Sequence, residues 1–211
     1  MASLSDLSAA APGYLKTYCS PASAYAWPHY DEDLLPTVLT ATDLLAPAYL
    51  SYPIKRTYLE QMHRLVDGAT NEYGRLRLAM EAVVADQTAA VLDFESVEVD
   101  GLNDRDTPGW GLVLRALDEA QHCSGLTSVA VTKILHRKRP RLVPINDSRV
   151  RAFFEVEKLG FRDLFQRIHQ ELNDHEGLLN NWSSPYRLPD GRKMMKLRAM
   201  DIAIWMSFEK Q

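Results

Sequence analysis

Apolar residues recur every three to four positions along most of the chain, which is the spacing of one face of an α-helix. This pattern predicts a predominantly helical protein. Proceeding along the chain, helices are predicted around 43–45 and at 54–66, 76–92, 110–121, 127–136, 147–156, 164–172 and 193–208.

Capping and helix-breaking residues set the ends of several predicted helices. Thr40 or Thr42 can cap the first one, because a hydroxyl accepts from a free amide at a helix start. Pro47 and Pro53 are expected to limit or bend that helix, since proline removes a backbone donor. Gly68 is the expected stop of the 54–66 helix.

The alternating stretch 94–99 is a candidate short strand. One such run does not make a sheet, so the predicted fold class is mainly α: a helical bundle with at most one short β element. Residues 1–36 are rich in Ala, Ser, Pro and Tyr and are predicted to be irregular. Residues 37–211 are predicted to form a single helical domain.

Composition excludes several classes of protein. Of the 211 residues 46% are hydrophobic and 25% are charged, which is ordinary for a globular chain. Two cysteines and the lack of a C-x-x-C spacing predict no disulfide scaffold, no metal site and no cofactor. The N-terminus lacks the pattern of a signal peptide, and no apolar run reaches the roughly 20 residues of a membrane span. A cytoplasmic protein without a membrane partner is therefore predicted, and its oligomeric state is left open.

Charge is distributed unevenly. The formal net charge of −4 argues against a dedicated high-affinity nucleic-acid binder. Basic residues nevertheless gather in two clusters, and a locally positive face can attract phosphate. The first cluster comprises Lys133, Arg137, Lys138, Arg139, Arg141, Arg149 and Arg151, and the second comprises Arg187, Arg192, Lys193, Lys196 and Arg198.

The first cluster follows a predicted helix–hairpin–helix. One helix ends at 122–124, Gly125 allows a tight reversal, and the next helix starts at once. Backbone amides at such a helix start suit a phosphate. The candidate anion-binding residues are therefore Gly125, Thr127, Ser128, Arg137, Lys138, Arg139, Arg141 and Arg149.

The run 125–147 resembles the helix–hairpin–helix DNA glycosylase superfamily, in which a hairpin helix leads through a proline-containing loop to a catalytic aspartate. The chain is still more similar to a bacterial domain of unknown function that shares this core, over much of residues 34–208. That likeness is carried by the runs 132–135 (TKIL), 137–144 (RKRPRLVP), 147–148 (DS) and 197–206 (LRAMDIAIWM). The resemblance implies a mainly helical core and Asp147 as the carboxylate that acts on the substrate.

Three departures from the glycosylase pattern narrow that implication. The hairpin keeps Gly125 but lacks a second glycine, and Thr127 stands where bifunctional glycosylases carry a nucleophilic lysine. Schiff-base lyase chemistry is therefore not expected. One additional residue also separates Pro144 from Asp147. The activity that the resemblance still implies for this chain is a monofunctional, aspartate-assisted hydrolysis.

Each candidate also has a purely structural interpretation. Asp147 can stabilise an oxocarbenium ion and orient water, or it can simply cap the following helix. Lys133 can assist Asp147 or hold a phosphate, or it can make a structural contact from a packed helix. Asp201 lies in an apolar helix and needs a partner, for which Arg198 or Lys133 is available. Cys123 is expected to be a buried, unreactive thiol.

Three hypotheses about function remain open. The first is a glycosylase-like protein that binds nucleic acid or a nucleotide-like anion at the basic hairpin, with Asp147 and Lys133 as catalytic candidates for N-glycosidic cleavage. The second is a hydrolytic or metabolite-tailoring enzyme that acts on an anionic small molecule. The third is a non-enzymatic interaction or immunity protein. The fold alone does not choose between them.

Overall fold

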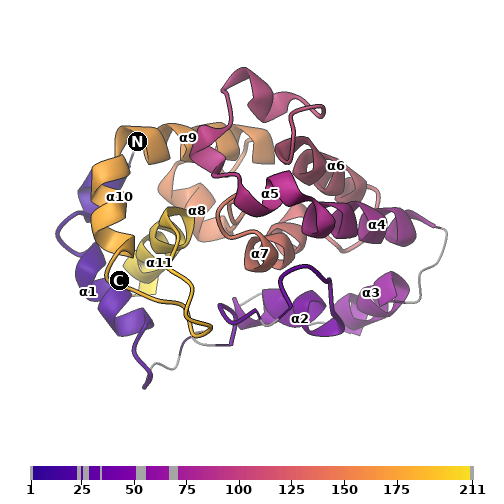
Figure 1. The fold of residues 1–211 in the computed structure, drawn as a ribbon, viewed down its shortest axis with the longest axis horizontal. Helices are drawn as coiled ribbons and strands as arrows, with labels where there is room; N and C mark the ends of the chain where they lie inside the picture. The colour runs from indigo at the N-terminus through magenta and orange to yellow at the C-terminus, as the bar shows by residue number, and fades with distance from the viewer. Residues whose placement is uncertain are drawn as a thin grey trace. The chain divides into compact units, whose positions relative to one another are not determined.

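The computed structural model describes residues 2–22, 25, 29–33, 35–50, 56–66 and 71–209 (Figure 1). Over these residues the protein is almost entirely helical, which confirms the mainly α class. The α-helices are α1 (Ala11–Tyr18), α2 (Ala41–Tyr49), α3 (Arg56–Val66), α4 (Glu72–Ala85), α5 (Gln87–Val91), α6 (Trp110–Gln121), α7 (Ser128–Lys138), α8 (Ser148–Phe153), α9 (Phe161–Asp174), α10 (Glu176–Ser183) and α11 (Lys196–Glu209). Short 3-10 helices are η1 (Leu4–Leu7), η2 (Phe94–Ser96) and η3 (Asp100–Asn103).

The chain groups into two compact units. Unit 1 comprises Met1–Glu32 with Pro144–Gln211, and unit 2 comprises Asp33–Val143. Unit 2 is thus continuous in sequence, whereas unit 1 is built from both ends of the chain. A single domain over 37–211 stays a prediction.

In unit 2, helices α4 and α6 pack side by side, and α7 packs against both of them (Figure 1). Helix α2 lies against α7, and α3 lies against α4. The core is aliphatic where α4 and α6 meet: Met80, Val83, Val113 and Leu114 are all fully buried. Burial of this apolar surface is the main stabilising contribution to the unit.

In unit 1, helix α11 is central, with α1, α8 and α10 packed around it (Figure 1). Most of α11 is buried, which explains its hydrophobic sequence, and the buried set includes the charged residues Arg198 and Asp201. A helix that is buried on nearly all sides needs apolar residues all round and a partner for each charge.

The N-terminal segment differs from the prediction of an irregular entry. It contains η1 and α1, whose residues Leu4, Leu7, Ala11, Leu15 and Tyr18 are buried. These positions are three or four residues apart, so the helical pattern is present in the sequence. The abundance of alanine, serine and proline obscured it, although Pro12 lies in the first turn, where proline is tolerated.

The prediction of a short strand at 94–99 is wrong. Phe94–Ser96 forms η2, and its amide at Phe94 donates to the carbonyl of Arg141 at 3.0 Å. Phe94 and Val97 are buried. Their spacing of three residues matches a 3-10 turn, whose side chains at i and i+3 lie above one another. Among the described residues, β pairing is confined to an isolated bridge between Arg187 and Lys193.

Several predicted helix ends are confirmed and others are revised. Thr40, rather than Thr42, caps α2 and forms a capping box with Asp43. The predicted 76–92 helix is divided at Asp86, which has an extended backbone and caps α5 by accepting from Ala89 N at 2.7 Å. Pro47 lies within α2, which ends two residues later. The candidate signals at 53, 54 and 68 lie outside the described residues.

Candidate functional site

The reversal between α6 and α7 has the backbone features that the sequence predicts. Gly125 has a φ of +80°, a left-handed conformation that favours glycine. A Cβ at this position would collide with the side chain of Gln61. Thr127 is the N-cap of α7 with an extended backbone, but its side chain makes no capping hydrogen bond, and the first turn of α7 holds no acid. The exposed start of α7 is therefore free of negative charge of its own.

Two residues of unit 2 that the sequence analysis did not select lie beside this turn. The hydroxyl of Tyr73 donates to the carbonyl of Ser124 at 3.0 Å. The guanidinium carbon of Arg64 lies 5.3 Å from the centroid of the Tyr73 ring, in a cation–π contact. Arg64 is exposed and has no ion pair within the described ranges. No local motif marks Arg64 or Tyr73, because each is far from Gly125 in sequence.

The two central cations of the basic run are buried in ion pairs. Arg137 Nε donates to Asp43 Oδ1 at 3.0 Å. Lys138 Nζ lies 2.8 Å from a carboxylate oxygen of both Asp33 and Asp43, and it also donates to the carbonyl of Leu35 at 2.9 Å. Lys138 is only 2% exposed. These two cations hold the start of α2 and the preceding segment against α7.

The next two cations also have internal partners. Arg139 donates to the carbonyls of Pro36 and Lys138, at 2.8 and 2.9 Å, and to the carbonyl of Val84. Burial lowers the pKa of its guanidinium. Arg141 makes a two-pronged pair with Asp93, at 2.7 and 2.6 Å, and these hydrogen bonds raise its pKa. Most of the basic side chains that were predicted to bind an anion therefore already pair with carboxylates or carbonyls of the protein.

The two catalytic candidates lie in different units. Lys133, in unit 2, is 2% exposed, and its Nζ donates to the carbonyl of Leu50 at 2.8 Å. Asp147, in unit 1, is the N-cap of α8, where its carboxylate accepts from the amide of Arg149 at 2.9 Å. The Arg149 guanidinium pairs with Glu209 at 2.6 Å and lies 4.3 Å from the centroid of the Trp205 ring. The capping interpretation of Asp147 is therefore realised, and a catalytic role stays a prediction.

The second basic cluster separates into buried and exposed members. Arg198 is 1% exposed and binds Asp31 through both carboxylate oxygens, at 2.7 and 2.8 Å. It also binds Asp201 at 2.6 Å and the hydroxyl of Tyr18 at 2.8 Å. The predicted partner of Asp201 is thus Arg198. Burial alone would lower the pKa of Arg198, and the charges around it more than offset that effect, so the pKa lies well above its ordinary value.

Of the remaining members of that cluster, Arg187, Arg192 and Lys193 lie in a short hairpin, and Lys196 is the first residue of α11. Arg192 pairs with Asp190 at 2.6 Å, and Lys196 pairs with Glu176 at 3.3 Å. Arg187 and Lys193 are exposed and directly opposite each other in the isolated β bridge.

Trp110, Trp182 and Tyr186 are the aromatic residues that could stack a planar ligand, and the two tryptophans lie in the core. Trp110 is fully buried, and its indole nitrogen donates to the carbonyl of Leu102 at 3.1 Å. Trp182 is 3% exposed, and Tyr186 is half-buried with its hydroxyl 3.5 Å from the carbonyl of Pro12. The two tryptophans are therefore too deeply buried to stack on a flipped base.

Both thiols are expected to react slowly. Burial raises the pKa of Cys19 to about 12 and that of Cys123 to about 11. Since the thiolate is the nucleophile, alkylation by iodoacetamide at pH 8 should be at least tenfold slower than for a free cysteine, for which the pKa is about 8.5. Mass spectrometry of the native and the urea-unfolded protein measures this directly. Equal rates in the two states would contradict the burial of the thiols.

The structure also contains a small cavity in unit 2. Its volume is about 110 Å³, and it is lined by Leu39, Thr40, Ala41, Leu44, Leu65, Val66 and Arg77. None of the predicted site residues lines it. Within the parts of the chain that the structure describes, no group of three or more His, Cys, Asp or Glu side chains is arranged to hold a metal ion. No helix there is both long and apolar enough to cross a membrane.

These features define an all-helical protein with a glycine hairpin between two packed helices and two buried ion networks. A family model described as "Family of unknown function (DUF6308)" matches residues 11–208, and the chain belongs to that family. The match begins at α1, so it includes more of the N-terminal segment than the resemblance at 34–208 implied. No curated protein and no solved structure shows significant similarity to the chain. The likeness to DNA glycosylases therefore stays a hypothesis.

Proposed function

We propose that the protein binds the phosphate backbone of a nucleic acid at the hairpin between α6 and α7, through the start of α7 and the side chain of Arg64. The observation that carries this proposal is an exposed helix start that has no side-chain cap and directly follows a left-handed glycine. The first amides of a helix have no intrahelical acceptor, and they bear the positive end of the helix dipole. Together these properties favour a phosphate at that position.

Three neighbours support a phosphate there. Gly125 has no side chain, which leaves room for the Gln61 side chain against the backbone of the hairpin. The Gln61 side chain lies against Gly125, and its Oε1 is buried without a hydrogen-bond partner in the described part of the chain. The Nε2 donor of Gln61 is the side-chain atom nearest the Cβ position of Gly125, so this donor already faces the hairpin. Arg64 adds an exposed positive charge, and the Tyr73 ring keeps it near the hairpin.

The charge arrangement sets the expected strength of binding. Arg137, Lys138, Arg139 and Arg141 have partners within unit 2 and contribute little to capturing a further anion. Few phosphates would be neutralised, and the net charge of −4 opposes binding. We therefore expect micromolar or weaker binding that decreases with salt, with a small slope of about 0.9 per phosphate contact.

Replacing Thr127 with Asp tests the hairpin directly. An aspartate at this N-cap should accept from an amide in the first turn of α7 and raise the melting temperature, because a good cap stabilises a helix by about 1 kcal/mol. The same carboxylate occupies the phosphate position and repels the ligand. Anisotropy of labelled DNA and RNA, each single- and double-stranded, across a salt series should show binding reduced at least tenfold in Thr127→Asp.

Two further variants complete this experiment. Arg64→Ala should weaken binding and lower the salt slope by about 1. Asn181→Asp changes the net charge by the same amount as Thr127→Asp, but at an exposed site on α10, and should bind like the wild type. If Thr127→Asp gains stability and keeps full affinity, the hairpin is not the binding site. If the wild type does not bind at low salt, the proposal fails.

Hydrolysis of an N-glycosidic bond by Asp147 is tested with the same samples. Asp147→Asn preserves the capping acceptor and removes the negative charge. Loss of base release with unchanged affinity would assign a catalytic role to Asp147. Absence of base release in the wild type, on duplexes that carry modified bases, would leave binding as the function.

A further inference from the structure

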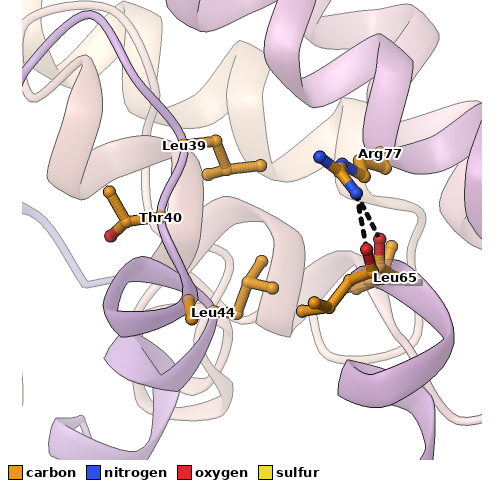
Figure 2. Close-up of a pocket in the computed structure, with 7 residues that line it drawn as sticks. Leu39, Thr40, Leu44, Leu65 and Arg77 are labelled. Atoms are coloured by element: carbon orange, nitrogen blue, oxygen red, sulfur yellow. Dashed lines mark hydrogen bonds between the residues drawn. The ribbon is translucent and has the colours of Figure 1, made fainter. Parts of the chain in front are cut away.

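The cavity in unit 2 combines apolar walls with one well-fixed cation. The apolar walls come from two segments (Figure 2). One is the start of α2 with the residue that precedes its cap, which provides Ala41, Leu44 and Leu39. The other is the end of α3, which provides Leu65 and Val66. Arg77, from α4, is the single charged side chain of the lining. Small-molecule sites are mostly apolar with a few convergent polar groups, and this cavity of about 110 Å³ has that composition on a smaller scale.

Arg77 is held by three hydrogen bonds that leave one edge of its guanidinium unused. Its Nη1 donates to the carbonyls of Leu65 and Val66, at 3.3 and 2.7 Å, and its Nε donates to Glu81 at 2.8 Å. A guanidinium has five donors in a fixed plane. The two donors on Nη2 have no partner among the residues that the structure describes, and Figure 2 shows the guanidinium extending toward the space beside Leu39.

The start of α2 adds a second positive element to the cavity. Ala41 is the first residue of α2, so the positive end of that helix dipole lies at the lining. The nearby carboxylate of Asp43 does not cancel this effect. It accepts from the amide and hydroxyl of Thr40, at 2.8 and 2.7 Å, and it is neutralised by Arg137 and Lys138.

We propose that this cavity is a binding site for a small aliphatic monocarboxylate, with the carboxylate on Nη2 of Arg77 and the alkyl group between Leu44 and Leu65. A dry cavity of about 150 Å³ accepts benzene. At about 110 Å³ this one fits an alkyl group of roughly four carbons. The site is independent of the hairpin and does not rest on nucleic-acid binding.

The test uses isobutyrate, valerate and the neutral analogue isobutyramide as probes of the full-length protein. Methyl NMR shifts of the leucines and valines, followed through a titration, should show binding of the two carboxylates with a Kd on the order of 1 mM. Isobutyramide should bind more weakly, because a neutral amide oxygen accepts less strongly from the Nη2 donors than a carboxylate does, although Glu81 already offsets part of the Arg77 charge.

Two variants separate ligand binding from folding. Arg77→Met keeps the apolar stem and should lower carboxylate affinity at least tenfold, while making the amide and the acid bind alike. Ala41→Leu places a larger side chain in the cavity from an exposed helix position and should also lower affinity at least tenfold. Ala82→Leu adds the same volume at an exposed position on α4 outside the lining and should bind like the wild type.

The outcomes decide the proposal. Selective shifts at Leu44 and Leu65, lost in both Arg77→Met and Ala41→Leu, would establish the site. Equal affinity for isobutyrate and isobutyramide would contradict the role of Arg77. An unchanged affinity in a stably folded Ala41→Leu variant, or no shifts in the wild type at carboxylate concentrations on the order of 50 mM, would overturn the site itself.

Discussion

Arg198→Met should destabilise the protein by about 3–5 kcal/mol, because it leaves two carboxylates buried without their cation. Asp31 and Asp201 are each 6% exposed, and both pair with Arg198. The variant also loses the hydrogen bond to Tyr18 and the cation–π contact with the Tyr30 ring, whose centroid lies 4.9 Å away. Domains are stable by only about 5–15 kcal/mol, so this loss is a large part of the total.

Urea unfolding followed by circular dichroism measures the change. Arg149→Met is the matched control, because its pair with Glu209 is about one third exposed and should be worth less than about 1 kcal/mol. A variant that combines Arg198→Met with Asp31→Asn and Asp201→Asn removes the orphaned charges and should recover part of the stability. If Arg198→Met is as stable as the control variant Arg149→Met, the ion network around Arg198 is not the main restraint on α11.

Lys138→Met should cost about 3 kcal/mol in unit 2 by the same mechanism. Lys138 Nζ lies 2.8 Å from carboxylate oxygens of both Asp33 and Asp43, and the side chains of all three residues are nearly inaccessible. Arg137 still pairs with Asp43 in the variant, which is why we expect a smaller loss than for Arg198. Hydrogen exchange should show the loss of protection in α2 and α7, which this cation joins.

Arg141→Met is the control for that variant. Its pair with Asp93 is more exposed and should contribute less than about 1 kcal/mol. Adding Asp33→Asn to Lys138→Met should recover part of the stability, since it removes one of the two carboxylate charges that Lys138 binds. If Lys138→Met and Arg141→Met lose the same small amount, the buried cluster is worth no more than a surface pair.

Most helices of the middle and C-terminal parts were predictable from local information, but α10 (Glu176–Ser183) was not predicted. Apolar spacing located α6, α7, α9 and α11, and the capping boxes and caps at Thr40 and Asp147 are visible as short motifs. Segments whose conformation depends on tertiary contacts were not predictable in this way. The run at 94–99 alternates like a strand, but the burial of Phe94 against the Trp110 ring decides its conformation.

The basic run shows the limit of sequence reasoning more sharply. Its positive charges were correctly located, but their partners are far away in the chain: Asp43 lies 94 residues before Arg137, and Asp33 lies 105 residues before Lys138. A single sequence does not show which distant acid meets which cation. Arg64, Tyr73 and Arg77 were missed for the same reason, since only folding brings them to the hairpin or the cavity.

Unit 1 is discontinuous in sequence, and this has a consequence for synthesis on the ribosome. Asp31 leaves the ribosome 167 residues before its partner Arg198. At roughly 5–20 residues per second, the wait is roughly 10–30 s. During this interval unit 2, which is continuous, can fold around its own core, whereas α1 and Tyr30 remain without the helix that covers them. The N-terminal apolar segment is therefore the part of the nascent chain most exposed to chaperones and proteases until α11 emerges.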